Sequence, residues 1–214
     1  MKRTILFLIA ALFTSSVALA DGKRMYAVTI TNITSGQTFT PLLVVTHKSS
    51  INLFELGEPS IPQLATIAES GNIGPMIDLL SSVPDRVYAT ANSEGLLGPG
   101  ESVTVEIPSK SRFDRVSVVG MLIPTNDTFV ALNSARLSRW ERSHVVPAYD
   151  AGSEYNDELC ANIPGPVCGG AGLSDENGEG YVHISSGIHG AADLESASYD
   201  WRNPVAKISV RRAR

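Results

Sequence analysis

Acidic side chains crowd into one short stretch of the sequence, PAYDAGSEYND (Pro147–Asp157). Asp150, Glu154 and Asp157 lie within the stretch, and Glu158 follows it. The glycine between Asp150 and Glu154 allows a turn that brings both carboxylates to one point. Hard cations such as calcium bind about six to eight oxygen atoms, many of them from carboxylates. The stretch therefore indicates either a bound cation or a solvated acidic turn.

Two carboxylates supply fewer than half of the ligands that calcium needs, so a third is expected from another part of the chain. The segment PTNDTFVAL (Pro124–Leu132) offers Asp127, which stands between a proline-led turn and an apolar strand. We expect Asp127, Asp150 and Glu154 to form a metal site.

A second polar segment, SDENGEGYVHISS, partly follows the spacing of an EF-hand loop. Asp175, Asn177, Glu179 and Gly180 occupy the positions of its first half. The twelfth position should be Glu but is Ser186, and no helices are expected on either side. This segment favours a solvated hairpin turn.

The histidines show no standard zinc spacing, since His183 and His189 are six residues apart. We expect His183 to be a half-buried, hydrogen-bonded residue on a strand. Ser185 and Ser186 lie near His189, but serines are common in exposed turns. A metal or catalytic role for these residues is not favoured.

Paired acids also serve glycoside hydrolases, in which the two carboxyl groups lie about 5–10 Å apart. A hydrolase of this class has an aromatic sugar cleft, but aromatic residues make up 7% of this chain, with Trp140 and Trp201 as the candidate platforms. No Gly-x-Ser-x-Gly motif occurs. A non-enzymatic role is favoured, and a hydrolase using Asp150 and Glu154 is the alternative.

The first twenty residues have the organisation of a signal peptide. Lys2 and Arg3 precede an apolar run, and Ala18 and Ala20 give an A-x-A-like cleavage site. The run is too short for a transmembrane span. We expect residues 1–20 to be a signal peptide and 21–214 to be one domain, secreted or periplasmic.

Charge excludes one class of partner. The chain has 17 basic and 22 acidic residues. Because Lys2 and Arg3 are the only charged residues of the leader, the mature chain has 15 basic and 22 acidic residues, a net charge of −7 with His neutral. Nucleic-acid binding needs clustered Lys and Arg, so nucleic acid is not an expected partner.

The two cysteines, Cys160 and Cys168, bracket the segment CANIPGPVC. In an exported chain such a pair is expected to form a disulfide. A metal-binding thiol pair is the alternative, and the lack of further cysteines disfavours it.

Alternating apolar residues recur along the chain and predict strands. The segments are rich in β-branched residues and are bounded by Gly, Pro, Asn or Ser: MYAVTITNIT, LLVVTH, ESVTVEI, RVSVVGMLI, TFVALNSARL, YVHIS and VAKISV. This number of strands in one domain predicts an all-β fold, an antiparallel β-sandwich.

Two segments break this alternation and predict short helices at 61–70 and 73–83. Leu64, Ile67 and Ala68 share one helical face, and Met76, Leu79 and Leu80 share another. Pro62 and Pro75 suit first-turn positions, and Gly71-Asn72 separates the two segments. We expect a helical crossover that caps an edge or an end of the sandwich.

The order of these pieces resembles the spondin N-terminal domain of F-spondin and mindin. The matching pieces are YAVTITNITSGQTFTPLLVVTH, LATIAESGNIGPMIDLL, SVVGMLIPTNDTFVALNS, PAYDAGSE and PVAKISVRR. The family's D-W-F-V-G element appears here as residues 127–131, and its Y-D-A-G-T-D loop appears as residues 149–154.

The resemblance implies a C2-like sandwich with a calcium site at one end, held by Asp127, Asp150 and Glu154. Glu154 replaces the family's Asp and is still a hard oxygen ligand. Thr128 replaces the family's Trp, so any contact made by that Trp does not transfer. The animal members carry cysteine-rich repeats after this domain, and functions that need those repeats do not transfer either.

These observations together predict a secreted, non-enzymatic adhesion or recognition module with calcium as its cofactor. The expected partner is an extracellular or cell-envelope protein or a glycan. Besides the hydrolase, the alternative is a structural envelope protein without a metal.

Overall fold

The fold is described from a computed structural model, which describes residues 22–174 and 178–213. The expected signal peptide and residues 175–177 of the second polar segment lie outside the described residues. The elements in chain order are β1 (Arg24–Asn32), β2 (Thr38–Phe39), β3 (Leu43–His47), α1 (Pro62–Ser70), α2 (Gly74–Ser81), β4 (Val87–Asn92), β5 (Ser102–Ser109), β6 (Arg115–Ile123), β7 (Thr128–Arg136), β8 (Arg142–Val146), β9 (Ala148–Asp150), β10 (His183–Ile184), α3 (Ser196–Tyr199) and β11 (Ala206–Arg212).

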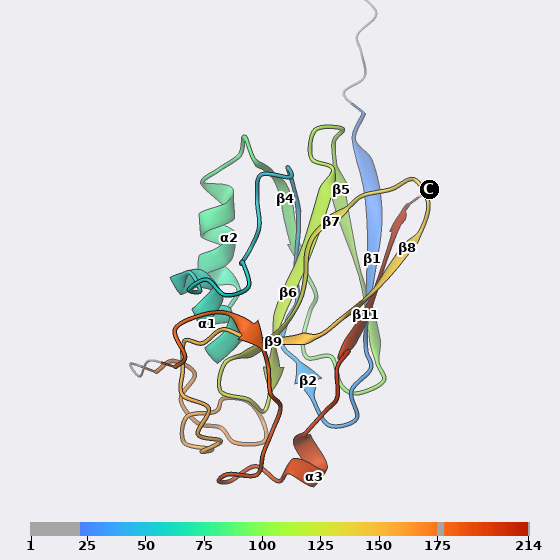
Figure 1. The fold of residues 1–214 in the computed structure, drawn as a ribbon. Helices are drawn as coiled ribbons and strands as arrows, with labels where there is room; N and C mark the ends of the chain where they lie inside the picture. The colour runs from blue at the N-terminus through green and yellow to red at the C-terminus, as the bar shows by residue number, and fades with distance from the viewer. Residues whose placement is uncertain (1–21, 175–177, 214) are drawn as a thin grey trace, which may run out of the picture.

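Two antiparallel sheets form the predicted sandwich (Figure 1). The smaller sheet has the order β5-β1-β11-β8, and the larger has the order β10-β9-β7-β6-β3-β4, with β2 paired to β6. The fold class is therefore confirmed. None of the helices in the described ranges has the length and apolar character of a membrane span.

Alternating residues of both sheets fill the space between them. Val28 and Ile30 of β1, Val118 of β6 and Ile208 of β11 belong to one buried cluster. Because side chains alternate along a strand, the exposed residues next to Val28, Ile30 and Ile208 face solvent on the outer side of the small sheet. Burial of this cluster holds the two sheets together.

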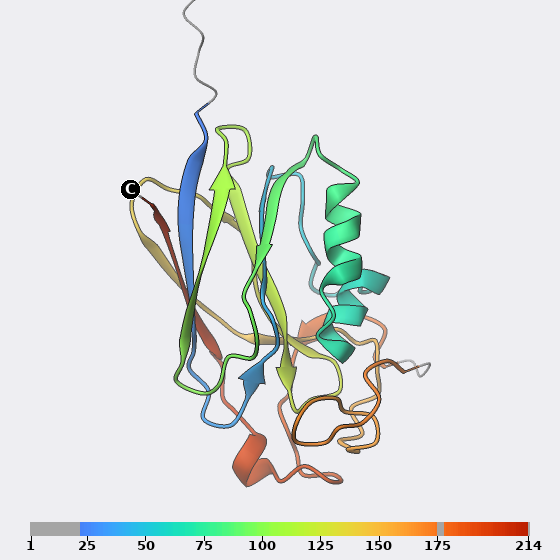
Figure 2. The same cartoon turned by 180° about the vertical axis from the view of Figure 1, so that it is seen from behind.

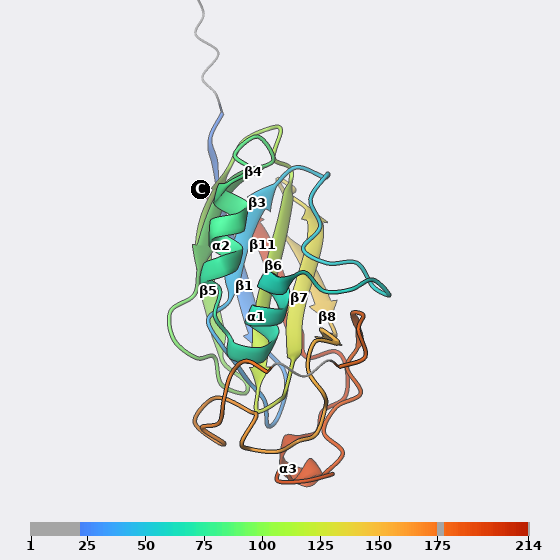
Figure 3. The same ribbon diagram turned by 90° about the vertical axis from the view of Figure 1, so that its left-hand side faces the viewer.

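The two predicted helices form, but their expected place was wrong. They cover the outer face of the larger sheet (Figures 2 and 3) rather than an edge or end of the sandwich. Leu64 and Ile67 of α1 pack in one cluster with Leu43, Val119 and Phe129 of the sheet. A sheet that is covered on both faces has continuously apolar strands, and in β6 eight of the nine residues are buried.

Local sequence fixes the helix ends. Pro62 is the first residue of α1, where its missing N–H costs nothing. Gly71 ends the helix with φ of 68°, and its N–H donates to the Ile67 carbonyl over 2.8 Å. In α2, Met76 and Leu80 are buried as expected, whereas Leu79 is 37% exposed.

The strands near the acidic stretch differ most from the sequence prediction. β8 and β9 were not predicted, and β10 has only two residues. β8 pairs in the small sheet and β9 in the large one, with Pro147 alone between them. The chain therefore changes sheets at Pro147, and this change carries the acidic loop to the end of the larger sheet.

Candidate functional site

The acidic loop follows β9. It lies beside the connections that follow β6 and β10, at one end of the sandwich (the lower end in Figure 1). Asp150 is the last residue of β9 and lies between two strands. It pairs with Thr128 of β7 on one side and with His183 of β10 on the other. Asp127 precedes Thr128, so strand pairing alone brings Asp127, Asp150 and His183 into one region.

Asp127 is fully buried, and only one of its two carboxylate oxygens has hydrogen-bond partners among the described residues. Its Oδ2 accepts hydrogen bonds from the backbone amides of Ser153 and Glu154, at 2.8 and 3.1 Å. Its Oδ1 is buried and has no hydrogen-bond partner among the described residues. Burial, followed by the charge of Asp150, raises the pKa of Asp127 to about 7, although the two amides oppose this shift.

Asp150 is also buried, at 1% exposure, but both of its oxygens have partners. Oδ1 accepts from the Gly152 amide at 2.8 Å, and Oδ2 accepts from the Asn156 side chain at 2.9 Å. Burial raises the pKa of Asp150, and these hydrogen bonds and His183 reduce the rise. Each oxygen keeps a further lone pair for a ligand.

Glu154 contributes to the same region mainly through its backbone. Its amide holds Asp127, while its buried side chain lies beside Asn126 and Glu69. Burial, followed by the charge of Glu69, raises the pKa of Glu154 to about 8, and Asp127 adds to this rise. The three predicted ligands are therefore electrostatically connected, and their joint binding of an ion stays a prediction.

Two residues that the sequence analysis had set aside lie against Asp150. His183 Nε2 is 3.4 Å from Asp150 Oδ1 and 3.6 Å from Glu179 Oε2. The ligand atoms of Asp150, Glu179 and His183 all lie within 4.8 Å of one another, so this group could hold a metal ion. His183 is half-buried and hydrogen-bonded, as expected, but its partner across the sheet required knowledge of strand order.

The other two acids of the stretch have structural roles. Glu158 is buried, and its two oxygens accept the backbone amides of His189 and Ala191 at 2.6 and 2.7 Å. Asp157 accepts from the side chains of Asn126 and Asn162. These carboxylates fasten neighbouring loops, so hydrogen bonds within the chain explain part of the crowding of acids.

The described residues contain one close Ser–His pair, and it is inaccessible. His47 Nε2 lies 2.8 Å from Ser117 Oγ, but both residues are 0% exposed. Ser185 Oγ instead pairs with the Thr128 hydroxyl at 3.0 Å and accepts from the Gly187 amide. No hydrogen bond joins Ser185 to His189 in the described ranges.

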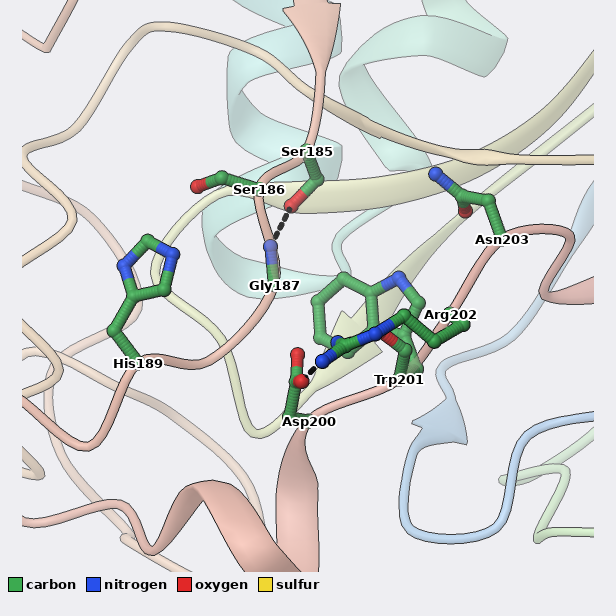
Figure 4. Close-up of a pocket in the computed structure, with 8 residues that line it drawn as sticks. All are labelled: Ser185, Ser186, Gly187, His189, Asp200, Trp201, Arg202 and Asn203. Atoms are coloured by element: carbon green, nitrogen blue, oxygen red, sulfur yellow. Dashed lines mark hydrogen bonds and ion pairs between the residues drawn. The ribbon is translucent and has the colours of Figure 1, made fainter.

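A pocket of about 380 Å³ opens beside this region, between residues 185–189 and 200–203 (Figure 4). Its lining is mostly polar, and the indole of Trp201 lies at its back, 8% exposed. Trp201 belongs to the core between the sheets, so it is not a flat sugar platform. The Thr128–Ser185 hydrogen bond connects this pocket to the strand that follows Asp127.

The predicted disulfide is present, joining Cys160 and Cys168. It closes a small loop within the same end of the molecule, and Ile163 of this loop is fully buried in the core between the sheets. The loop is thereby fixed to the sandwich.

Comparison with known proteins supports the resemblance seen in the sequence. The family model Spondin_N matches residues 26–156, which is more than half of the chain and includes Asp127, Asp150 and Glu154. Glu179 and His183 lie after the matched residues. No curated protein matches the chain. The chain belongs to the Spondin_N family.

Proposed function

We propose that this protein is an exported, non-enzymatic recognition module whose loop end is ordered by a bound calcium ion. Asp127, Asp150 and Glu154 are the proposed ligands. The ion would remove the repulsion between buried carboxylates and fix the acidic loop against the start of β7. It would order the surface rather than take part in a reaction.

One observation carries this proposal: Asp127 is 0% exposed, yet its Oδ1 has no partner in the described part of the chain. A buried and unsatisfied carboxylate oxygen costs free energy unless an ion or a donor reaches it. Asp127 interacts electrostatically with Asp150 and Glu154, which are acids as well. A divalent cation compensates all three groups at once, and carboxylates are the ligands that calcium prefers.

Family membership and the disulfide support export to an oxidising compartment, either secreted or periplasmic. Adhesion is the role that the spondin resemblance suggests, with an extracellular or envelope protein or a glycan as partner. The polar pocket at the loop end is the concave surface that such a partner would meet. The hydrolase alternative, which would use Asp150 and Glu154, has less support, because Trp201, one of its two candidate sugar platforms, is buried in the core between the sheets.

Isothermal titration with calcium tests the site. The chelator-treated protein is expected to bind one calcium ion, and Asp127→Asn is expected to weaken binding at least about tenfold, which is about 1.4 kcal/mol. Asp85→Asn is the matched control, since Asp85 is exposed and lies in the connection between α2 and β4, outside the acidic loop. Absence of calcium binding, or equal affinity in Asp127→Asn, would contradict the proposal.

A further inference from the structure

Asp150 faces a second group of ligands besides the acids of its own loop. Its Oδ1 and Glu179 Oε2 both lie close to His183 Nε2, at 3.4 and 3.6 Å. Two ligands at zinc–ligand distances and a tetrahedral angle are about 3.3 Å apart. The two separations from His183 therefore already match the spacing of ligands around one ion, and all three ligand atoms lie within 4.8 Å of one another.

The orientation of His183 prepares its nitrogen for a metal. Its Nδ1 lies 3.0 Å from the Ile184 carbonyl, which can only accept a hydrogen bond. Nδ1 must therefore carry the proton, and Nε2 has the lone pair when the ring is neutral. Nε2 is buried and has no hydrogen-bond partner among the described residues. Metal-binding histidines have this arrangement, with the second nitrogen donating to a carbonyl or carboxylate.

Asn156 holds the two carboxylates in place from the opposite side. Its side-chain nitrogen donates to Asp150 Oδ2 at 2.9 Å and to Glu179 Oε1 at 3.3 Å. The remaining oxygens, Asp150 Oδ1 and Glu179 Oε2, are the two nearest to His183. Such outer contacts orient metal ligands in known sites.

Asp127, the residue that carries the calcium proposal, adds negative charge to this group. It is fully buried, its Oδ1 has no partner in the described ranges, and it interacts electrostatically with both Asp150 and Glu179. Asp150 and Glu179 therefore place two carboxylates beside His183 Nε2, and Asp127 adds a third negative charge that interacts with both of them. A hydrogen-bonded surface cluster would not leave a buried oxygen in this condition.

We propose that Asp150, Glu179 and His183 form a zinc-type site that shares the Asp150 carboxylate with the calcium ligands. Imidazole nitrogen suits zinc and related transition ions, whereas calcium takes oxygen ligands. Three protein ligands leave a fourth position for water or for a donor from a partner. Of the three proposed ligands, only Asp150 lies within the residues matched by the family, and Glu179 and His183 lie beyond them. The inference rests on the proposed function only through Asp150.

A double titration separates the two sites. The protein, expressed with its own leader and without a histidine tag, is treated with chelator, freed of it, and titrated with zinc and with calcium in separate experiments. His183→Gln and Glu179→Gln are expected to weaken zinc binding at least about tenfold and to leave calcium binding unchanged. Glu154→Gln should weaken calcium binding and leave zinc binding unchanged. Asp150→Asn should weaken the binding of both ions.

His189→Gln is the matched control, because His189 is exposed and outside the group. Unchanged calcium binding in His183→Gln also reports that the loop end is folded. Zinc binding that persists in His183→Gln, or no zinc binding in a protein that binds calcium, would overturn this inference and leave the calcium proposal standing. Zinc binding that depends on His183, in a protein that does not bind calcium, would support this inference and contradict the calcium proposal.

Discussion

His183 Nε2 lies 3.4 Å from Asp150 Oδ1, and the two residues are direct partners across β9 and β10. Side chains of directly opposed residues point to the same face of a sheet, so this pairing alone brings the imidazole to the carboxylate. β10 has only two residues, yet it positions the one nitrogen ligand of the cluster. The main structural consequence of this short strand is therefore the position of His183 beside Asp150.

Gly152 should be essential for the loop end. Its φ is +61°, and an added Cβ would lie 2.3 Å from the Tyr181 carbonyl oxygen. Gly152→Ala is therefore expected to push the acidic loop away from the segment before β10, to destabilise the protein by about 2–4 kcal/mol and to weaken both zinc and calcium binding. Thermal unfolding and titration measure these effects.

Gly95→Ala is the control for this change. Gly95 has a similar φ of +67° but no atom within 4 Å of the added Cβ. The free energy of unfolding of this variant should fall by only about 1 kcal/mol, the cost of placing alanine at a positive φ, and metal binding should be kept. Equal effects of the two substitutions would show that the close approach at Gly152 is unimportant.

Asp127→Asn should stabilise the protein when no metal is present. At pH 8 the buried carboxylate of Asp127 is charged and has no partner at Oδ1. Asparagine keeps one oxygen for the amides of Ser153 and Glu154 and offers an N–H₂ toward the other acids. We expect a gain of about 1–3 kcal/mol in EDTA, measured by denaturant unfolding, and a loss of the calcium response. A less stable variant in EDTA would argue that Asp127 is satisfied without a cation.

His47 predicts a pH dependence that is independent of the metal. Burial lowers the pKa of its imidazole, with the Lys48 carbonyl opposing and Arg115 adding to this shift. The unfolded chain therefore binds more protons than the folded one below about pH 6.5. Stability contributed by the neutral ring is present above pH 6.5 and is lost as the pH falls, by at most about 1.4 kcal/mol per pH unit.

The measurement compares unfolding free energies of the wild type and His47→Gln between pH 7.5 and 5, both in calcium. The difference between the two proteins should shrink toward acid pH, because only in the wild type does unfolding at acid pH let residue 47 bind a proton that the folded protein does not hold. A difference that is constant with pH would mean that the pKa of His47 is the same in the folded and the unfolded protein.

The disulfide should contribute stability without affecting metal binding. Closing a loop of this length removes about 2–3 kcal/mol of unfolded-state entropy in the chain-entropy account. The double variant Cys160→Ser/Cys168→Ser should unfold about 5–10 °C lower, since a domain of this size loses about 2–4 °C per kcal/mol. Its calcium affinity should equal that of the wild type. Loss of calcium binding would show that the 160–168 loop supports the acidic loop directly.

The sequence was sufficient for those features that depend on local pattern. Period-2 alternation located β1, β5 and β11, and Pro62 and Gly71 marked the ends of α1. It did not reveal that the helices cover a sheet face, although the continuous apolar run of β6 carried that information. β4 was missed because four of its six residues are only half-buried, which blurs the alternation.

The site was only partly predictable for a similar reason. Asp127 could be found because it precedes a predicted strand, and Asp150 because it lies in a crowded acidic stretch beside Gly152. Glu179 and His183 join Asp150 through the pairing of β9 with β10, which is a long-range contact. Neither their spacing nor their residue types indicated that partner, so strand order had to come from the structure.

Thermal unfolding of the wild type and of Asp150→Asn, each in EDTA and in millimolar calcium, tests whether a bound calcium ion orders the loop end. A ligand that binds only the folded state at a hundred times its Kd adds about 2.7 kcal/mol. We predict that calcium raises the Tm of the wild type by about 5–10 °C and leaves the Tm of Asp150→Asn nearly unchanged. An equal Tm of the wild type in EDTA and in calcium would contradict the account of a calcium-ordered loop end.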